Sequence, residues 1–167
     1  MTPALGKLAS RLEQSGQPQA MYRSVEEETQ RLVGHKLFTL LHVDGADVAR
    51  VYSSNTAAYP VFGRKPMGPT PWGKHVLENR MPYLGTTAAD IRWAFFDHEL
   101  IASLGLGSVI NIPVVYDGKT IGTMNLLDAE GHYNEAHVAN VVALAPLLVP
   151  AFLLAAKNYR TQIGDPS

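Results

Sequence analysis

Hydrophobic positions at helical spacing mark both ends of the chain. Leucines recur every three or four residues over residues 5–12, as on the buried side of a helix. A second helix is predicted from about Gln19 to Val33, where apolar side chains share one side and a run of three glutamates faces solvent. A long apolar run predicts a third helix from about Asn134 to Tyr159, with Asn134 as its N-cap.

Two pairs of β-rich runs lie between these helices, and an Asp-Gly turn joins the members of each pair. Such a turn between β-rich runs strongly favours a β-hairpin. The paired runs are Lys36–Val43 with Asp47–Ser54, and Ser108–Val115 with Thr120–Asp128.

The segment from Asn55 to Gly107 has a different composition. It holds five of the eleven prolines, six glycines and both tryptophans, and its periodicity is weak. Two short helices are predicted, Pro71–Asn79 and Asp97–Leu104 with Asp97 as N-cap, and Met81–Leu84 is a candidate short strand. A long irregular segment inside a compact domain is usually functional or mobile.

This order of elements predicts an α+β domain. We expect a central antiparallel sheet of five or six strands, with the terminal helices on one face and the irregular insert, residues 55–107, on the other. We expect a helical N-terminal extension over residues 1–18, the domain itself over residues 19–160, and a flexible tail over residues 161–167, in a stand-alone chain.

The alternation within the second hairpin assigns its two faces. Alternate residues of the two strands form one set that is wholly apolar and a second set that contains Asn111, Thr123 and Asn125. We expect the apolar set to pack on the terminal helices and the polar set to face the insert. Buried amides need partners, which are either groups of the insert itself or a ligand. The apolar set is Ile110, Ile112, Met124 and Leu126.

A pocket is therefore predicted between the polar face of the sheet and the insert, which supplies aromatic walls. His75 is a candidate axial haem ligand or hydrogen-bond donor within it. Arg50, Asp90 and Arg92 either recognise a polar ligand or lie solvated at the surface. The predicted ligand-binding residues are Tyr52, Tyr59, Phe62, Trp72, His75, Asp90, Ile91, Trp93, Phe95, Asn111, Thr123 and Asn125.

Composition excludes several functions. The chain has no cysteine, which removes disulfides, thiolate metal sites and cysteine nucleophiles. Its formal net charge of −1 and scattered basic residues argue against nucleic-acid binding. Catalytic motifs and paired metal-binding histidines are absent from the sequence, so no catalytic or metal-binding residue is predicted. The apolar run Val138–Ala156 is nearly long enough to cross a bilayer, but its asparagine and prolines favour a buried helix instead.

The C-terminal half resembles a GAF domain. The matching features are a strand with an internal proline (Pro113), an Asp-Gly turn, a Gly-x-x-Asn-Leu strand containing Gly122 and Asn125, and then Tyr133, an acid at Glu135 and a long apolar helix. The first half agrees in the order of its elements, so the resemblance spans roughly residues 19–159. It implies a ligand pocket roofed by the insert and terminal helices that often dimerise.

The same resemblance narrows the ligand classes. Members that bind cyclic nucleotides carry an Asn-Lys…Phe…Asp-Glu signature, whereas here Leu126 follows Asn125 and a single acid remains at Glu135. Bilin attachment through cysteine is excluded in this chain. The free methionine sulfoxide reductases resemble GAF domains too, but they need cysteines.

These observations predict a cytoplasmic, non-catalytic sensory module. It would bind an unidentified small molecule, with no cofactor indicated, and signal as a homodimer through its terminal helices. One alternative is an interaction module without a ligand, whose apolar terminal helix is the functional surface. A further alternative is a cysteine-free relative of the free methionine sulfoxide reductases with a different activity.

Overall fold

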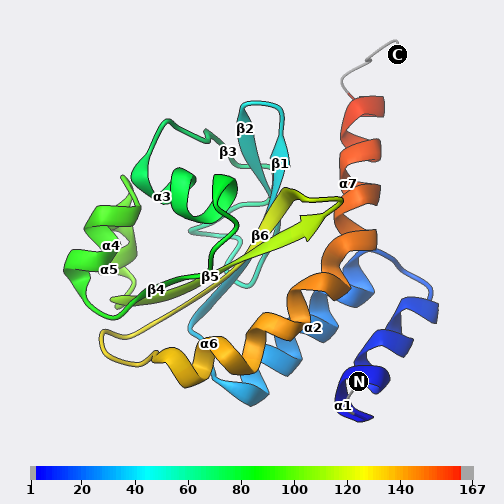
Figure 1. Cartoon of the computed structure of the whole chain (residues 1–167), viewed down its shortest axis with the longest axis horizontal. Coiled ribbons are helices and arrows are strands. Elements are labelled where there is room, and N and C mark those ends of the chain that lie inside the picture. Colours follow the sequence, from blue (N-terminus) through cyan, green and yellow to red (C-terminus); the bar gives the residue numbers. More distant parts are fainter. Residues whose placement is uncertain (1–2, 163–167) are drawn as a thin grey trace.

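Six antiparallel strands form one sheet, in the order β3-β2-β1-β6-β5-β4 (Figure 1). The computed structural model describes the backbone of residues 3–162 and the side chains of residues 3–158. The predicted α+β fold is confirmed, with six strands. The strands are β1 Leu37–Asp44, β2 Asp47–Ser53, β3 Arg64–Pro66, β4 Tyr83–Gly85, β5 Ser108–Tyr116 and β6 Lys119–Asp128.

Both predicted hairpins are present. In the first, Asp44 pairs with Asp47, and in the second Tyr116 pairs with Lys119, so each loop has two residues. In the second loop both residues have left-handed backbones, with φ of 50° at Asp117 and 73° at Gly118. That geometry matches the right-handed twist of the strands it joins, which explains why an Asp-Gly pair is favoured here.

The terminal helices cover one face of the sheet (Figure 1). The apolar parity of the second hairpin packs against them, as predicted, and all four of its side chains are at most 1% exposed. Tyr22 and Phe152 reach the same core from opposite ends of the chain. The helical segments are α1 Pro3–Ala9, η1 Ser10–Glu13, α2 Gln19–Leu32, α6 Glu135–Val141, η3 Val142–Leu148 and α7 Val149–Gln162.

The C-terminal helix is not the continuous α-helix that was predicted. It begins as predicted, since the Asn134 side chain accepts a hydrogen bond from the His137 backbone N–H. Its middle part, η3, is a 3-10 helix that contains Pro146, which has no N–H to donate. Helix α7 then continues to Gln162, so the predicted tail from residue 161 starts inside a helix; residues 163–167 lie outside the described residues.

The helical run Glu135–Asn158 contains an 18-residue window with a mean hydropathy of 2.3, and it is long and apolar enough to span a membrane. A core helix of a soluble protein passes the same test. Here the run contributes Val141, Leu144, Leu148 and Phe152 to the core against the sheet. One side of the run is therefore buried as expected, but only 33% of its most apolar window is buried in the domain.

The insert covers the opposite face of the sheet (Figure 1). The helix predicted from Pro71 is present but its second part is a π-helix, and the predicted short strand is β4. Strand β3 and helix α4 were missed, although a capping box formed by Thr87 and Asp90 begins α4. The helical segments of the insert are α3 Pro71–Gly73, η2 Lys74–Glu78, α4 Ala88–Ala94 and α5 His98–Ser103.

Candidate ligand-binding site

A chain of buried hydrogen bonds crosses three strands on the insert side of the sheet. The Trp72 indole N–H donates to Asn111 Oδ1 over 3.0 Å, and Asn111 Nδ2 donates to Asn125 Oδ1 over 2.8 Å. Asn125 Nδ2 in turn donates to the carbonyl and hydroxyl oxygens of Thr39, over 3.3 and 3.4 Å. We call these four residues the polar relay.

The register of the sheet builds the polar relay. Asn111 on β5 lies directly opposite Asn125 on β6, which lies opposite Thr39 on β1. Each of these side chains is at most 6% exposed, and an unpaired buried amide would be costly. The amides therefore bind one another and the Trp72 ring of the insert, which answers the question left open by the sequence.

A small cavity of about 40 Å³ lies between the polar relay and the insert, and we call it the inner cavity. A site of this size holds a few water molecules or one small group. Apolar side chains of strands β1 and β6 and of helix α5 make up part of its wall. The lining residues are Leu37, Thr39, Leu41, Arg50, Tyr59, Lys65, Trp72, Phe95, Asp97, Ile101, Asn111, Asn125 and Leu127.

Arg50 brings a guanidinium to the inner cavity. Its Cζ lies 4.8 Å from the centre of the Tyr59 ring, and its Nη1 donates to the Pro60 carbonyl over 3.0 Å. Gly63 makes room for this group, because a Cβ there would lie 2.7 Å from Nη1. Arg50 Nε is buried without a hydrogen-bond partner among the residues that the structure describes.

Asp97 is the single carboxylate at the inner cavity. Its Oδ2 accepts a hydrogen bond from the Tyr59 hydroxyl over 3.1 Å, while Oδ1 is buried with no partner in the described part of the chain. Asp97 is the N-cap residue of α5, as predicted, but its side chain forms no capping hydrogen bond. Burial and the neighbouring Asp97 raise the pKa of Tyr59, so its hydroxyl stays a donor.

Lys65 adds a second cation. Its Nζ lies 5.5 Å from the centre of the Phe95 ring and 5.9 Å from that of Phe96. Burial lowers the pKa of Lys65, Asp97 opposes that shift, and Arg50 adds to it. Burial also lowers the pKa of Arg50. Two cations and one carboxylate thus meet at the inner cavity, where electrostatic interactions are stronger than in water.

A larger cavity of about 260 Å³ adjoins the inner one, and we call it the outer cavity. The two share Lys65, Trp72 and Phe95, so these three side chains form the partition between them. The rings of Trp72 and Phe95 have centroids 5.9 Å apart. The other residues around the outer cavity are Val48, Pro66, Met67, Thr70, Pro71, Arg92, Trp93, Ala94 and Phe96.

Comparison with known proteins identifies this arrangement. A family model described as "GAF domain" matches residues 15–152. The chain belongs to the GAF domain family. GAF domains are typically sensory or regulatory modules and are generally non-catalytic. No curated protein sequence matches this GAF domain.

Solved structures share the fold at low sequence identity. The GAF domain of a phosphoenolpyruvate-protein phosphotransferase from Coxiella burnetii is 17% identical with a TM-score of 0.72, covering 92% of this chain and 93% of that one. The GAF domain of a two-component sensor histidine kinase from Bacillus halodurans is 13% identical with a TM-score of 0.68, covering 83% of this chain and 95% of that one. The chromophore-binding domain of a bacteriophytochrome from R. palustris is 10% identical with a TM-score of 0.67, covering 94% of this chain and 61% of that one.

Five of the predicted site residues of this GAF domain meet at the inner cavity, and Trp93 lies at the outer one. Thr123 shares the face of the polar relay, and its hydroxyl is buried with no partner among residues 3–158. Trp93 is 49% exposed and stacks on Tyr83. The five at the inner cavity are Tyr59, Trp72, Phe95, Asn111 and Asn125.

Three other predicted residues have structural contacts instead. Ile91 is buried in a small apolar cluster under the insert. His75 Nε2 lies 2.8 Å from the Pro82 carbonyl oxygen, so it holds the chain before β4. Asp90 accepts hydrogen bonds from the backbone N–H groups of Thr86 and Thr87, which lower the pKa of its carboxyl. Asp90 is therefore a capping residue of α4.

The placement of Tyr52 beside the insert is wrong. Leu40 pairs with Tyr52 and Leu41 with Arg50, so Val51 is an extra residue in β2 and forms a bulge. The bulge reverses the parity of the strand and turns Tyr52 towards the terminal helices. There its hydroxyl donates to Glu26 of α2.

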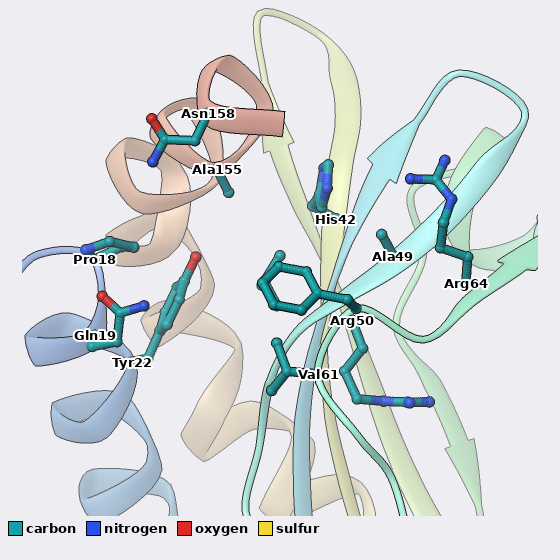
Figure 2. Close-up of a pocket in the computed structure, with 12 residues that line it drawn as sticks. Pro18, Gln19, Tyr22, His42, Ala49, Arg50, Val61, Arg64, Ala155 and Asn158 are labelled. Carbon is teal, nitrogen blue, oxygen red and sulfur yellow. The ribbon is translucent and has the colours of Figure 1, made fainter. Parts of the chain in front are cut away.

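Phe62 also lies away from the inner cavity. Its ring is 71% exposed, and it lines a third cavity of about 230 Å³ on the helix side of the sheet. Figure 2 shows Tyr22, His42 and Asn158 around this cavity, contributed by α2, β1 and α7. Phe62 was placed by its aromatic character alone, and only the path of the loop after Pro60 decides its side.

The sequence analysis missed Lys65 and treated Arg50 as an open choice. Lys65 lies in a segment rich in proline and glycine, where no periodicity indicates a strand or its buried side. Arg50 lies in a predicted strand, two residues after the apolar Val48. Alternation along the strand could therefore have placed the two side chains on the same face. Among the residues that the structure describes, no group of three or more His, Asp or Glu could hold a metal ion.

Proposed function

We propose that this GAF domain is a non-catalytic sensory module that binds a small molecule at the inner cavity and extends it into the outer cavity. The observation that supports this most is the set of unpartnered buried polar atoms there, Arg50 Nε and Asp97 Oδ1. Native proteins rarely leave such atoms unpaired, so each of them needs an explanation, and a bound group that supplies the partner is the one we propose. Apolar walls with a few placed polar groups are typical of small-molecule sites.

The fold offers a route from the site to the terminal helices. Trp72 and Phe95 of the insert line the inner cavity on one face of the sheet. Strands β1, β5 and β6 line it from below, and their other face packs on α7. A ligand that binds one arrangement of the insert more tightly shifts the population towards it. The sheet would then pass that shift to α7 through the contact between Gly122 and Phe152.

We further propose that the domain acts as a cytoplasmic homodimer through its C-terminal helix. Val142, Leu153 and Leu154 are 41%, 41% and 37% exposed on that helix, although all three are apolar. Exposed apolar patches of this kind mark interaction surfaces. Without cysteines, the fold needs no oxidising compartment.

Thermal melting against a metabolite library tests the sensory function. We expect at least one compound to raise the melting temperature. The variant Tyr59→Phe should weaken its binding up to about tenfold, because it removes the hydroxyl that holds Asp97 Oδ2 and so frees a carboxylate that lines the inner cavity. Tyr116→Phe makes the same chemical change at a hairpin residue that is 50% exposed, and it serves as the control. If Tyr59→Phe and Tyr116→Phe bind every stabilising compound equally well, the inner cavity is not the site.

A further inference from the structure

The charges around the inner cavity do not balance. Arg50 and Lys65 are cationic, Asp97 is anionic, and all three line the same small space. Buried charges are costly unless they are paired and hydrogen-bonded. All three side chains are only half-buried, and together they leave the inner cavity with an excess of one positive charge.

The existing contacts leave this excess uncompensated. Asp97 uses Oδ2 for the Tyr59 hydroxyl, and it forms no ion pair within 4.0 Å with Arg50 or Lys65. Lys65 rests on the rings of Phe95 and Phe96, and Arg50 Nε has no acceptor among residues 3–158. The inner cavity thus has an excess of positive charge and one donor, Arg50 Nε, without an acceptor among the described residues.

The adjoining outer cavity has the same sign of charge. The outer cavity is lined by Lys65 and Arg92, and its lining includes no acidic residue. Clefts lined by one sign of charge raise the local concentration of ligands of the opposite sign. The remaining outer wall is apolar and aromatic, with Met67, Trp93 and Phe96.

From these observations we infer that the ligand is a small organic monocarboxylate. Its carboxylate lies between Arg50 and Lys65 in the inner cavity, and its apolar remainder passes Trp72 and Phe95 into the outer cavity. The inference rests on the proposed sensory function and adds the chemical class of the ligand. One carboxylate accepts from Arg50 Nε and brings the net charge of the site to zero.

Asp97 adds a second element of selectivity. Its Oδ1 is a buried acceptor without a donor in the described residues, so a hydroxyl group next to the carboxylate would satisfy it. A second carboxylate on the ligand would instead meet Asp97 and be repelled. The site therefore favours monocarboxylates over dicarboxylates, and 2-hydroxy acids over their deoxy forms.

Calorimetry and thermal melting at constant ionic strength test this assignment. The probes are sodium phenylacetate, mandelate, butyrate and 2-hydroxybutyrate, with phenylacetamide and butyramide as neutral counterparts. We expect at least one carboxylate to raise the melting temperature by about 5–10 °C at about a hundred times its Kd. The matching amide binds at least about tenfold more weakly, because it lacks the charge.

Two variants connect binding to the lysine. Lys65→Met keeps the length of the side chain and removes its charge, and we expect at least a tenfold loss of carboxylate affinity, as for removal of a charge-assisted partner. Lys119→Met, at an exposed hairpin position, is the matched control and keeps full affinity. Comparison of carboxylate with amide in the wild-type protein decides the question even if Lys65→Met does not fold.

Four results would overturn the inference, and they separate it from the proposed function. If the amides bind as tightly as the carboxylates, or if Lys65→Met binds like Lys119→Met, charge recognition is absent. If only neutral compounds from the wider library stabilise the domain, and their binding is weakened by Tyr59→Phe, the ligand class is wrong and the sensory function stands. If no compound of any class binds, both fail.

Discussion

Individual residues of the insert side show how a half-buried cation is held without an ion pair. Lys65 lies on two aromatic rings, and Arg50 lies on a third, the ring of Tyr59. Such contacts compensate part of the lost hydration of a cation. They do not neutralise it, so the protonation of Lys65 is coupled to the folding of the domain.

This coupling predicts how stability depends on pH. Because burial lowers the pKa of Lys65 in the folded state, the unfolded chain holds the lysine proton more tightly over the range below its ordinary pKa of 10.5. Stability rises with pH wherever the unfolded state binds more protons. We therefore expect the ligand-free wild type to gain stability relative to Lys65→Met as the pH rises towards 10.5.

Chemical denaturation of both proteins at about pH 7 and about pH 9.5 measures this gain. Subtracting the variant removes the contributions of the other titrating groups, including Tyr59. Lys119→Met again provides the control, since its lysine is exposed. An unchanged difference between wild type and Lys65→Met at the two pH values would show that Lys65 is solvated.

At the scale of elements, the fold depends on a close approach between α7 and the sheet. A Cβ on Gly122 of β6 would lie 2.3 Å from Phe152 Cε2 and 2.4 Å from the Leu41 carbonyl oxygen. The phenyl ring can move, but the carbonyl belongs to the backbone of β1. Only glycine lets α7 lie this close, which gives a physical reason for the glycine in the Gly-x-x-Asn-Leu strand.

Gly122→Ala should therefore destabilise the domain strongly. Overpacking a well-packed core costs typically about 1–3 kcal/mol, and the immobile backbone oxygen places this change at about 3 kcal/mol or above. Gly131→Ala provides the comparison, because a Cβ there meets no atom within 4 Å and only the positive φ of 77° is unfavourable. That backbone term is about 1–2 kcal/mol. Equal losses in urea unfolding for the two variants would contradict the close approach.

For the whole molecule, the open question is what covers the exposed apolar side of the C-terminal helix. Core positions of α6, η3 and α7 face the sheet, while Val142, Leu153 and Leu154 remain exposed. A second copy of the chain would bury them and place two α7 helices together. A dimer of this kind would connect the sheet of one protomer with that of its partner.

Analytical ultracentrifugation tests this arrangement. We expect a concentration-dependent dimer, and we expect Leu153→Lys to weaken it about tenfold or more, as for a central interface residue. Leu12→Lys is the matched control, since Leu12 is 38% exposed on η1 and belongs to the N-terminal extension. A wild-type protein that stays monomeric, or an equal effect of the two changes, would refute the dimer. A dimer that forms while no compound of the metabolite library binds the domain would favour the interaction module without a ligand.

Much of the fold could be predicted from sequence because it depends on neighbours along the chain. The alternation of Asn111 and Asn125 with apolar residues defined the two faces of the second hairpin, and Asp-Gly pairs defined both turns. Asn134 indicated the start of the long helix by its capping preference. Each of these signals is local, since a side chain and the backbone groups it affects lie within a few residues.

The site required the tertiary structure, because its contacts join segments far apart in the chain. Trp72 meets Asn111, and Thr39 meets Asn125 across 86 positions, through the register of three strands. One extra residue at Val51 turned Tyr52 to the other face, which no periodic pattern reports. Sequence alone thus determined which face of the sheet carries polar groups. Only the packing of the insert over that face decided that Arg50, Lys65 and Asp97 share one cavity.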